Sequence, residues 1–133
     1  MAITQGSHHI GLTVPDIRAT CNFFVDVLGF ERVGEVPDYP AIFVSDGTIM
    51  LTLWQALDPA NAKSFDRRNN IGLHHFALKV DNLKTLKSIH QTLSNTPGVE
   101  IEFPPEPLGS SNTQHMIFYI PGGVRMELIA LVD

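Results

Sequence analysis

SHHIGLTVPDI, at residues 7–17, is repeated as LHHFALKVDNL at residues 73–83, an offset of 66 positions. The two copies share a pair of adjacent histidines, a leucine and a valine. A second match, between residues 42–53 and 117–128, has no gaps and an offset of 75, with identical Ile, Phe, Gly and Leu residues. Because internal repeats reveal the supersecondary unit of a chain, we infer two similar halves with the same order of elements.

The two offsets differ by nine residues, so the second half must contain an insertion. The segment PPEPLGSS at residues 104–111 is rich in proline, glycine and serine, which are typical of loops. We therefore predict that the insertion lies there and forms a loop near the functional site.

The hydrophobic period changes in a regular order within the first half. Residues 8–14 alternate between apolar and polar or small, which indicates a half-buried strand. Asp16 can cap a following helix, whose apolar positions are spaced along one face and which ends at Gly29. Three further strands are predicted, at residues 31–36, 41–45 and 48–55, the last two joined by an Asp46-Gly47 turn.

The second half repeats this order. A strand is predicted at residues 74–80, then a helix with Leu83, Leu86, His90 and Leu93 on one face. Three strands follow, at residues 99–103, 115–120 and 124–130. The fold class is therefore α+β, one domain at residues 1–133 built from two βαβββ modules at about residues 7–55 and 73–131.

A polar linker at residues 56–70 joins the two modules and carries several basic residues. We expect these basic side chains to be solvated, with recognition of an anionic substrate as the alternative.

Strand alternation selects among the six histidines. In each module the apolar face of the first strand must pack on a helix, which leaves His9 and His75 on the opposite face beside small or polar residues. Such a face has room for a ligand. His8 and His74 have the opposite parity and are interpreted as flanking groups that orient a ligand. His90 is assigned to the edge of the core and, as a weaker alternative, His115 to proton transfer.

The last strand places a carboxylate on the same face. Val124, Met126 and Leu128 form its apolar side, so Glu127 points into the cavity together with Arg125. Burying this carboxylate is unfavourable unless it is paired or binds a cation, which requires Arg125, a lysine or a metal. A single strand histidine is more often structural, but the repeated pair with Glu127 favours a metal site formed by His9, His75 and Glu127. Such a set suits Fe, Mn, Co, Ni or Zn.

The first module differs at the position that matches Glu127, which is Thr52. A neutral hydroxyl is a weak ligand, so we expect three protein ligands. Met50 and Trp54 face the same side and make that wall apolar, where Trp54 could stack on a ring. Met50, Trp54 and Arg125 are the predicted substrate-binding residues, with ordinary sheet packing as the alternative for Met50 and Trp54.

Three motifs, HIGLTV at residues 9–14, FFVDVLGF at 23–30 and PGGVRMEL at 121–128, resemble those of the vicinal oxygen chelate superfamily. This is the group of glyoxalases, bleomycin resistance proteins and extradiol dioxygenases. The resemblance covers nearly the whole chain. It implies a cup-shaped mixed sheet, a divalent metal in the cup, substrates that chelate the metal through two neighbouring oxygens, and a homodimer.

Carried over residue by residue, the resemblance assigns the metal ligands to His9, His75 and Glu127. Glyoxalase I enzymes of the family have a fourth ligand where Thr52 stands, which argues against a lactoylglutathione lyase. The expected function is a metal-dependent lyase, isomerase or dioxygenase acting on a small oxygenated metabolite. The alternative is a non-catalytic protein that binds a drug or metabolite, as bleomycin resistance proteins do.

Composition limits the other classes. The 133 residues are 44% hydrophobic and 17% charged, enough apolar material for one packed domain. The net charge is −5 and no basic cluster is present, so nucleic acid is not expected as a partner. With a single cysteine, a polar N-terminal segment and no long apolar run, the sequence predicts a soluble, cytoplasmic protein without a membrane anchor.

Overall fold

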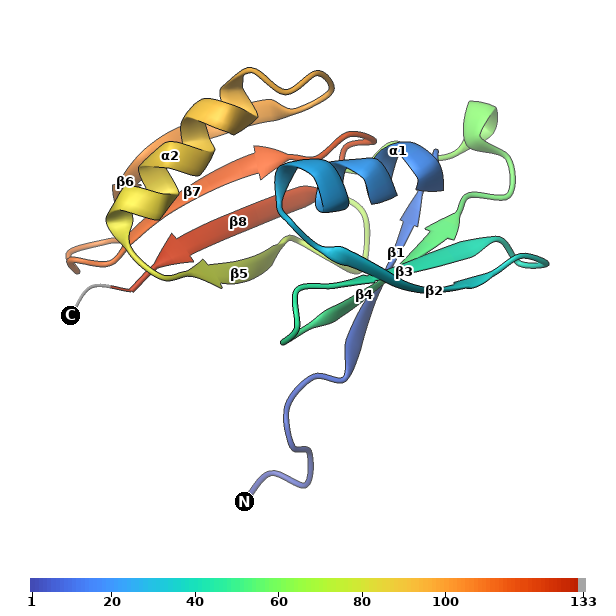
Figure 1. Ribbon diagram of the computed structural model, residues 1–133, viewed down its shortest axis with the longest axis horizontal. Helices are drawn as coiled ribbons and strands as arrows, with labels where there is room; N and C mark the ends of the chain where they lie inside the picture. Colours follow the sequence, from blue (N-terminus) through green and yellow to red (C-terminus); the bar gives the residue numbers. More distant parts are fainter. Residues whose placement is uncertain (132–133) are drawn as a thin grey trace. The chain divides into compact units, whose positions relative to one another are not determined.

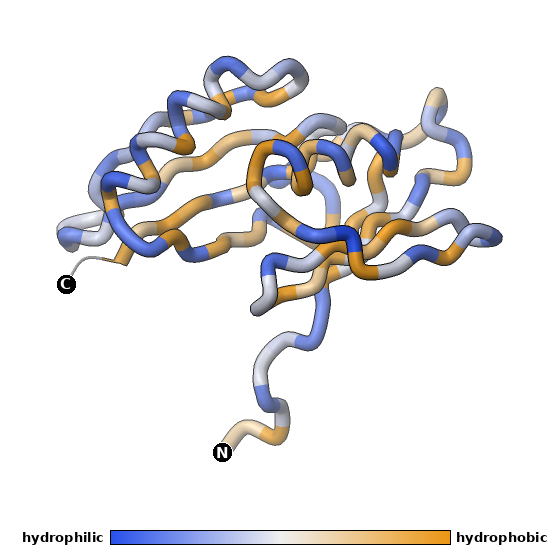
Figure 2. The backbone as a smooth tube through the Cα atoms, viewed as in Figure 1, coloured by the Kyte–Doolittle hydropathy of each residue, from blue (hydrophilic) through white to orange (hydrophobic). Residues whose placement is uncertain are grey.

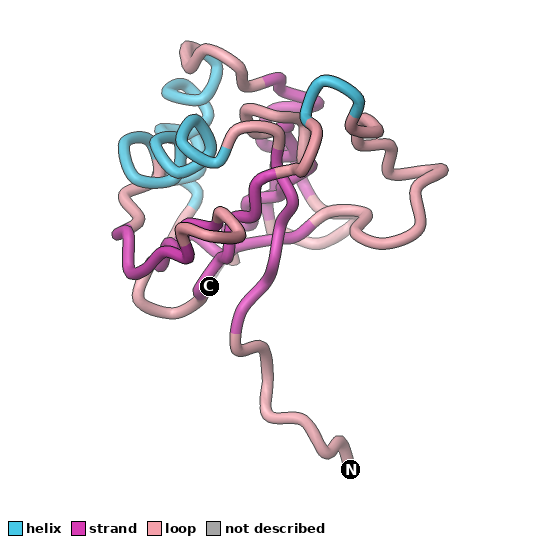
Figure 3. Tube along the Cα trace, turned by 90° about the vertical axis from the view of Figure 1, so that its right-hand side faces the viewer, coloured by secondary structure: helices cyan, strands magenta, loops and turns pink. Residues whose placement is uncertain are grey.

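The computed structural model describes residues 1–131, so only residues 132–133 of the predicted domain 1–133 lie outside the described part. The chain forms two compact units, Met1–Ala62 and a second that begins at Lys63. Their boundary falls inside the predicted linker, which contains one short helix, η2 (Pro59–Asn61) (Figure 3). Each unit contains one predicted module. That the two sheets form a single cup stays a prediction.

The first unit contains one four-stranded mixed sheet. Its strand order is β1-β4-β3-β2, with β1 parallel to β4 and the other pairs antiparallel (Figure 1). This is the predicted βαβββ order. The elements are β1 (His9–Val14), α1 (Ile17–Asn22), η1 (Phe23–Val27), β2 (Glu31–Val36), β3 (Ala41–Ser45) and β4 (Met50–Gln55).

The helix of the first unit begins and ends where the sequence predicts. The side chain of Asp16 accepts hydrogen bonds from the backbone N–H groups of Arg18 and Ala19, both at 3.1 Å. Gly29 ends the helix with φ of +75°, a conformation that glycine adopts without steric strain. The predicted single helix is in fact α1 followed by a π-helical turn, η1, which widens the last turn before the chain enters β2.

The second unit repeats this topology, with strand order β5-β8-β7-β6 and β5 parallel to β8. Two mixed sheets, each with its own helical segment, confirm the α+β class. The elements are β5 (Phe76–Val80), α2 (Leu83–Ser94), β6 (Glu100–Pro107), β7 (Gln114–Tyr119) and β8 (Arg125–Ala130).

Only the second half of the predicted loop at residues 104–111 lies outside a strand. Strand β6 continues through Pro107, and its pairing with β7 shifts register between Ile101 and Phe103 and again between Phe103 and Glu106. These irregularities absorb extra residues within a paired strand. Because β6 is an edge strand, its prolines need not donate a ladder hydrogen bond.

The hairpin loops that lead into the last strands, β4 and β8, differ in length by one residue. Ile42 pairs with Leu53 in the first unit, whereas its sequence match Ile117 pairs with Glu127 in the second. Equivalent residues of β4 and β8 are therefore 75 positions apart in the sequence. Equivalent residues of β3 and β7 are 74 positions apart. As a result, Ala41 occupies the place that His115 has in the second unit.

The core of the second unit lies between α2 and one face of its sheet. Leu86 and Leu93 of α2 are fully buried, as are Met116, Phe118 and Met126 of the facing strands. In Figure 2, α2 alternates between hydrophilic and hydrophobic colour while β7 carries a hydrophobic run. The other face of the sheet carries the polar side chains of His115 and Glu127 together with Ile117 and Ile129.

No helix within residues 1–131 is both long and apolar enough to span a bilayer.

We predict that Leu93→Ala destabilises the protein by about 2–5 kcal/mol, because it removes a fully buried side chain and leaves a cavity. Chemical denaturation followed by circular dichroism measures this change. Leu108→Ala is the matched control, since the Leu108 side chain is 40% exposed and its truncation should alter stability by less than about 0.5 kcal/mol. Equal effects of the two substitutions would contradict the assigned core.

Candidate functional site

Three titratable side chains meet on the open face of the second sheet. Glu127 in β8 lies opposite Ala77 of β5 and Ile117 of β7. His75 comes one residue before β5, and alternation places it on the same face as Ala77. The structure thus brings together His75 and Glu127, as strand parity predicts.

The Glu127 carboxylate is held between two imidazoles. It is 8% exposed. Its Oε1 atom lies 3.3 Å from Nε2 of His75, and its Oε2 atom accepts a hydrogen bond from Nδ1 of His115. An ionised carboxylate has no proton to give, so His115 is the donor. Within residues 1–131 these two imidazoles are the basic side chains that lie within 4 Å of the Glu127 carboxylate oxygens.

His115 is the site residue that sequence reasoning missed as a partner of Glu127. It is 9% exposed and its ring packs against Phe103 at a centroid distance of 4.9 Å. The alternation of β7 would have revealed it, because His115 pairs with Ile129 and thus shares the face of Glu127. The gapless alignment concealed this relation, since it is one residue out of register in β7.

Arg125, predicted to bind substrate, is committed to another carboxylate. Its Nε and Nη2 atoms donate to the two oxygens of Glu102 at 3.0 and 2.8 Å, a bidentate pair. Its remaining Nη1 atom lies 3.3 Å from Nδ1 of His74. The residue is 6% exposed, and its role toward substrate stays a prediction.

The Glu102 carboxylate also contacts two further side chains, those of Tyr119 and Arg67. The Tyr119 hydroxyl donates to it at 2.9 Å, and Arg67 Nη1 lies 3.2 Å from the same carboxylate oxygen. Arg67 also donates to the Tyr119 hydroxyl at 2.5 Å. The linker arginine is therefore not simply solvated as expected but ties the start of the second unit to its sheet.

These contacts shift the ionisation of the cluster. The hydrogen bonds from Arg125 hold the pKa of Glu102 at about 2, with Tyr119 and Arg67 adding to the effect. The bound carboxylate in turn raises the pKa of Arg125, while burial and then the hydrogen bond to Glu102 raise that of Tyr119. Desolvation and the positive charge of Arg125 lower the pKa of His74.

The geometry of His75 and Glu127 fits a shared metal ion. Adjacent ligand atoms around a metal with bonds of about 2.1 Å are separated by about 3.0–3.4 Å, and Nε2 of His75 and Oε1 of Glu127 are 3.3 Å apart. No group of three potential ligands within residues 1–131 is arranged to hold a metal. The predicted third ligand, His9, is exposed at the start of β1 in the first unit, and its participation stays a prediction.

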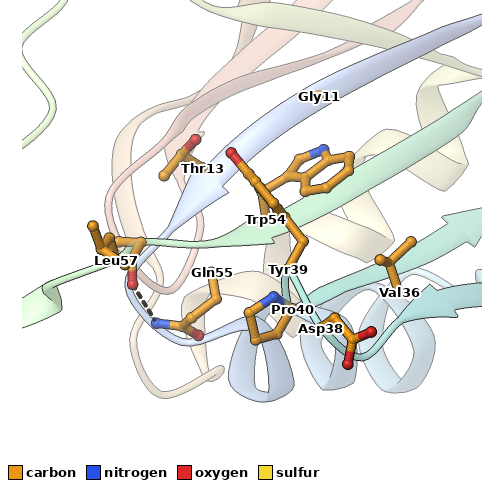
Figure 4. A pocket seen from close by; sticks show the side chains of 10 residues that line it. Gly11, Thr13, Val36, Asp38, Tyr39, Pro40, Trp54, Gln55 and Leu57 are labelled. Carbon is orange, nitrogen blue, oxygen red and sulfur yellow. Dashed lines mark hydrogen bonds between the residues drawn. The ribbon is translucent and has the colours of Figure 1, made fainter.

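A separate pocket of about 1090 Å³ lies on the first unit (Figure 4). Trp54 and Tyr39 form an edge-to-face pair there, with ring centroids 4.8 Å apart. The indole Nε1 of Trp54 donates to the Thr52 hydroxyl at 2.9 Å. Met50 is not among the lining residues, which are Gly11, Thr13, Val36, Asp38, Tyr39, Pro40, Trp54, Gln55, Ala56 and Leu57.

Gly11 allows the indole to lie across the sheet. A Cβ atom at this position would approach the Thr52 hydroxyl to 3.2 Å, which is tight, and Trp54 Nε1 to 3.5 Å, which is ordinary contact, so a side chain would crowd the hydroxyl that accepts the indole N–H. The predicted role of Trp54 as an apolar wall is consistent with this geometry.

The sequence matches the profile of the Glyoxalase/Bleomycin resistance protein/Dioxygenase superfamily over residues 6–128. The chain belongs to this superfamily. No curated protein sequence matches it.

Solved structures of other superfamily members share the fold. The fosfomycin resistance protein FosX from Listeria monocytogenes is 18% identical with a TM-score of 0.75, covering 98% of this chain and 96% of its own. A glyoxylase/bleomycin resistance protein/dioxygenase domain from Frankia sp. EAN1pec is 19% identical with a TM-score of 0.77, covering 98% and 94%. A lactoylglutathione lyase from Agrobacterium tumefaciens is 20% identical with a TM-score of 0.69, covering 97% and 96%.

We predict that Glu102→Gln lowers stability at neutral pH by about 1–2 kcal/mol, after allowance for solvent screening of the partly exposed ion pairs. The pKa of Glu102 is lower in the folded state, about 2, than its ordinary value of 4.5, so its contribution is present above pH 4.5. It is lost as the pH falls from 4.5 to about 2. Denaturant unfolding of both proteins across this range should show the difference narrowing.

The matched control is Glu106→Gln on the same strand. Glu106 forms no ion pair within residues 1–131, and its substitution should change stability at neutral pH by less than about 0.5 kcal/mol. A Glu102→Gln difference that stays constant down to pH 2 would argue against the assigned carboxylate cluster.

Proposed function

We propose that this chain is a divalent-metal-dependent enzyme of the superfamily, acting on a small oxygenated metabolite. The observation that carries the proposal is the Glu127 carboxylate, which is 8% exposed and lies 3.3 Å from Nε2 of His75. A carboxylate in such a position needs compensation by a positive charge or by several hydrogen bonds.

The alternatives for compensating Glu127 can be compared directly. Arg125 lies two residues before Glu127 and on the same face of β8, but it binds Glu102 in a bidentate manner. Lys79 on β5 forms no ion pair with Glu127 among the described residues. Two imidazoles remain as its polar neighbours, and imidazole nitrogens together with a carboxylate oxygen form a donor set that binds divalent transition metals. A metal cation is therefore the compensation that the donor set favours.

His75 and Glu127 would hold the metal, with His9 as the predicted third ligand. A divalent ion bound there would act as a Lewis acid toward oxygen atoms of the substrate. His115 donates to the second oxygen of Glu127 and so orients the carboxylate. Elemental analysis of the purified protein would identify which of Fe, Mn, Ni, Co and Zn is bound.

The proposed reaction is of the lyase, isomerase or dioxygenase type. In the first module Thr52 stands where glyoxalase I enzymes have a fourth ligand, and its hydroxyl accepts a hydrogen bond from Trp54. Three protein ligands leave open positions that two substrate oxygens can fill. The Trp54 pocket supports a substrate that also carries a flat or apolar group.

A second candidate function is a binding protein that sequesters a drug or metabolite without chemistry. The observation that favours it is the Trp54 and Tyr39 wall of the first-unit pocket, whose aromatic rings would suit a planar apolar ligand without a metal. Metal content distinguishes the two functions.

The proposed assembly is a homodimer. Its support is the resemblance to the superfamily, and sedimentation equilibrium at several protein concentrations tests it.

We predict that protein purified without a metal-chelating column contains about one transition-metal ion per chain. His75→Ala and Glu127→Ala should each weaken metal binding by more than about 100-fold while leaving the circular dichroism spectrum unchanged, because each removes a ligand. His9→Ala tests the predicted third ligand in the same way. Elemental analysis and Co²⁺ titration measure these effects.

The control for the metal experiment is His90→Ala. His90 lies on α2, which covers the opposite face of the sheet, so its loss should leave metal affinity within about twofold. Wild-type protein that binds none of the five candidate metals after dialysis would refute the enzyme proposal and favour the binding protein.

The Trp54 pocket allows a direct optical measurement. Trp54 is the single tryptophan of the sequence, so we expect planar aromatic ligands that stack there to quench its fluorescence. Gly11→Ala should weaken such ligands about tenfold, because the added Cβ crowds the Thr52 hydroxyl that holds the indole in place. Val33→Ala serves as the control, since Val33 is 53% exposed on β2 and does not line this pocket. Unchanged affinity in Gly11→Ala would place the ligand elsewhere.

A further inference from the structure

The two adjacent histidines of the second unit contact each other through the same ring atom. Nδ1 of His74 lies 2.7 Å from Nδ1 of His75. At this distance exactly one of the two nitrogens must carry the shared proton, because two lone pairs or two N–H groups would repel. The direction of this hydrogen bond decides the tautomer of His75.

Arg125 settles the direction. Its Nη1 atom lies 3.3 Å from Nδ1 of His74, and a guanidinium can only donate. Nδ1 of His74 therefore presents its lone pair, which accepts the short hydrogen bond from His75, while the guanidinium N–H at 3.3 Å adds an electrostatic attraction to the same lone pair. It follows that His75 carries its proton on Nδ1.

The consequence appears on the other side of the His75 ring. A neutral imidazole that is protonated on Nδ1 has a free lone pair on Nε2, and this atom lies 3.3 Å from Oε1 of Glu127. Without the contact from His74, the carboxylate would attract the proton to Nε2 and block that lone pair. Two opposing hydrogen-bond acceptors, His74 and Glu127, thus compete for one proton.

We propose that Arg125 and His74 are positioning residues that hold His75 in the tautomer with a bare Nε2, ready to bind a metal ion beside Glu127. The inference rests on the proposed metal-dependent function, which it deepens by naming the residues that prepare one ligand. Neither residue touches the metal in this scheme; each acts through the next side chain.

The Arg125 guanidinium is well placed for this role because its other contacts fix its orientation. Glu102 binds its Nε and Nη2 atoms at 3.0 and 2.8 Å, which leaves Nη1 directed toward His74. Arg125 is 6% exposed, so its orientation is fixed by packing as well as by charge. Tyr119 and Arg67 complete the surroundings of Glu102.

The internal repeat provides a natural comparison. His8 and His9 of the first unit have the same contact, with their Nδ1 atoms 2.9 Å apart. The position that corresponds to Arg125 is Met50, which follows from the pairing of His9 with Met50 in β1 and β4. Methionine donates no hydrogen bond, so the His8–His9 pair has no counterpart of Arg125 at this position, and the inferred control of the tautomer applies to the second module.

The test is a long-range ¹H–¹⁵N correlation spectrum of ¹⁵N-histidine-labelled, metal-free protein, at a pH where the imidazoles are neutral. The spectrum distinguishes the two tautomers of each histidine directly. We expect His75 in the Nδ1–H form in the wild type and in the Nε2–H form in His74→Phe, which keeps a ring but removes the acceptor. His74 is exposed, so this substitution should not disturb folding.

Two further variants sharpen the test. His74→Asn restores an acceptor through its amide oxygen and should recover the Nδ1–H form, whereas His8→Phe, the equivalent change in the first unit, should leave the His75 signals unchanged. Co²⁺ titration of the same proteins should show about 10- to 100-fold weaker binding for His74→Phe, with partial recovery in His74→Asn.

The outcomes separate this inference from the proposed function. An Nε2–H tautomer of His75 in the wild type, or the same tautomer in wild type and His74→Phe, would overturn the positioning role whatever the metal content. The expected tautomers in a protein that binds no Co²⁺ would support the role of Arg125 and His74 and refute the metal-dependent function.

Discussion

The buried carboxylate of Glu127 is the constraint on which the second unit depends. It lies in the central part of a sheet face, 8% exposed, with the apolar Met126 and Leu128 beside it in the strand. A charge in this position is unfavourable without compensation, so the neighbouring strands must provide partners. His115 from β7 and His75 at the start of β5 do so, and their nitrogens reach the two carboxylate oxygens separately. The open face of this sheet is therefore polar at its centre, while α2 covers the apolar face.

A second carboxylate keeps the nearest arginine away from the first. Arg125 and Glu127 share one face of β8, and a direct ion pair between them would neutralise the proposed ligand. Glu102 on the edge strand prevents this pairing by binding Arg125 in a bidentate manner, supported by Tyr119 and Arg67. Because of this division into two clusters, the basic side chains within 4 Å of the Glu127 carboxylate are, among residues 1–131, those of His75 and His115. This arrangement supports the proposed metal site, because the Glu127 carboxylate is not neutralised by an arginine.

The two modules have kept the same topology and changed the chemistry of their open faces. Thr52 corresponds to Glu127, Met50 to Arg125 and Ala41 to His115, so three polar or charged groups of the second sheet are replaced by a hydroxyl and two apolar side chains. The space on the first sheet is occupied by the Trp54 indole, which Gly11 permits to lie close to the strand. One module thus carries the titratable cluster, and the other carries the aromatic pocket.

Alternation and repetition in the sequence were sufficient to predict both βαβββ modules, the capping by Asp16, the helix end at Gly29, and the common face of His75 and Glu127. These features follow from local periodicity and from residues with strong conformational preferences. The tertiary structure decided the rest. The one-residue difference between the hairpins brought His115 to Glu127, and the irregular pairing of β6 carried Glu102 to Arg125. Both depend on strand register, which is set by cross-strand pairing between distant segments and has no local signature in the sequence.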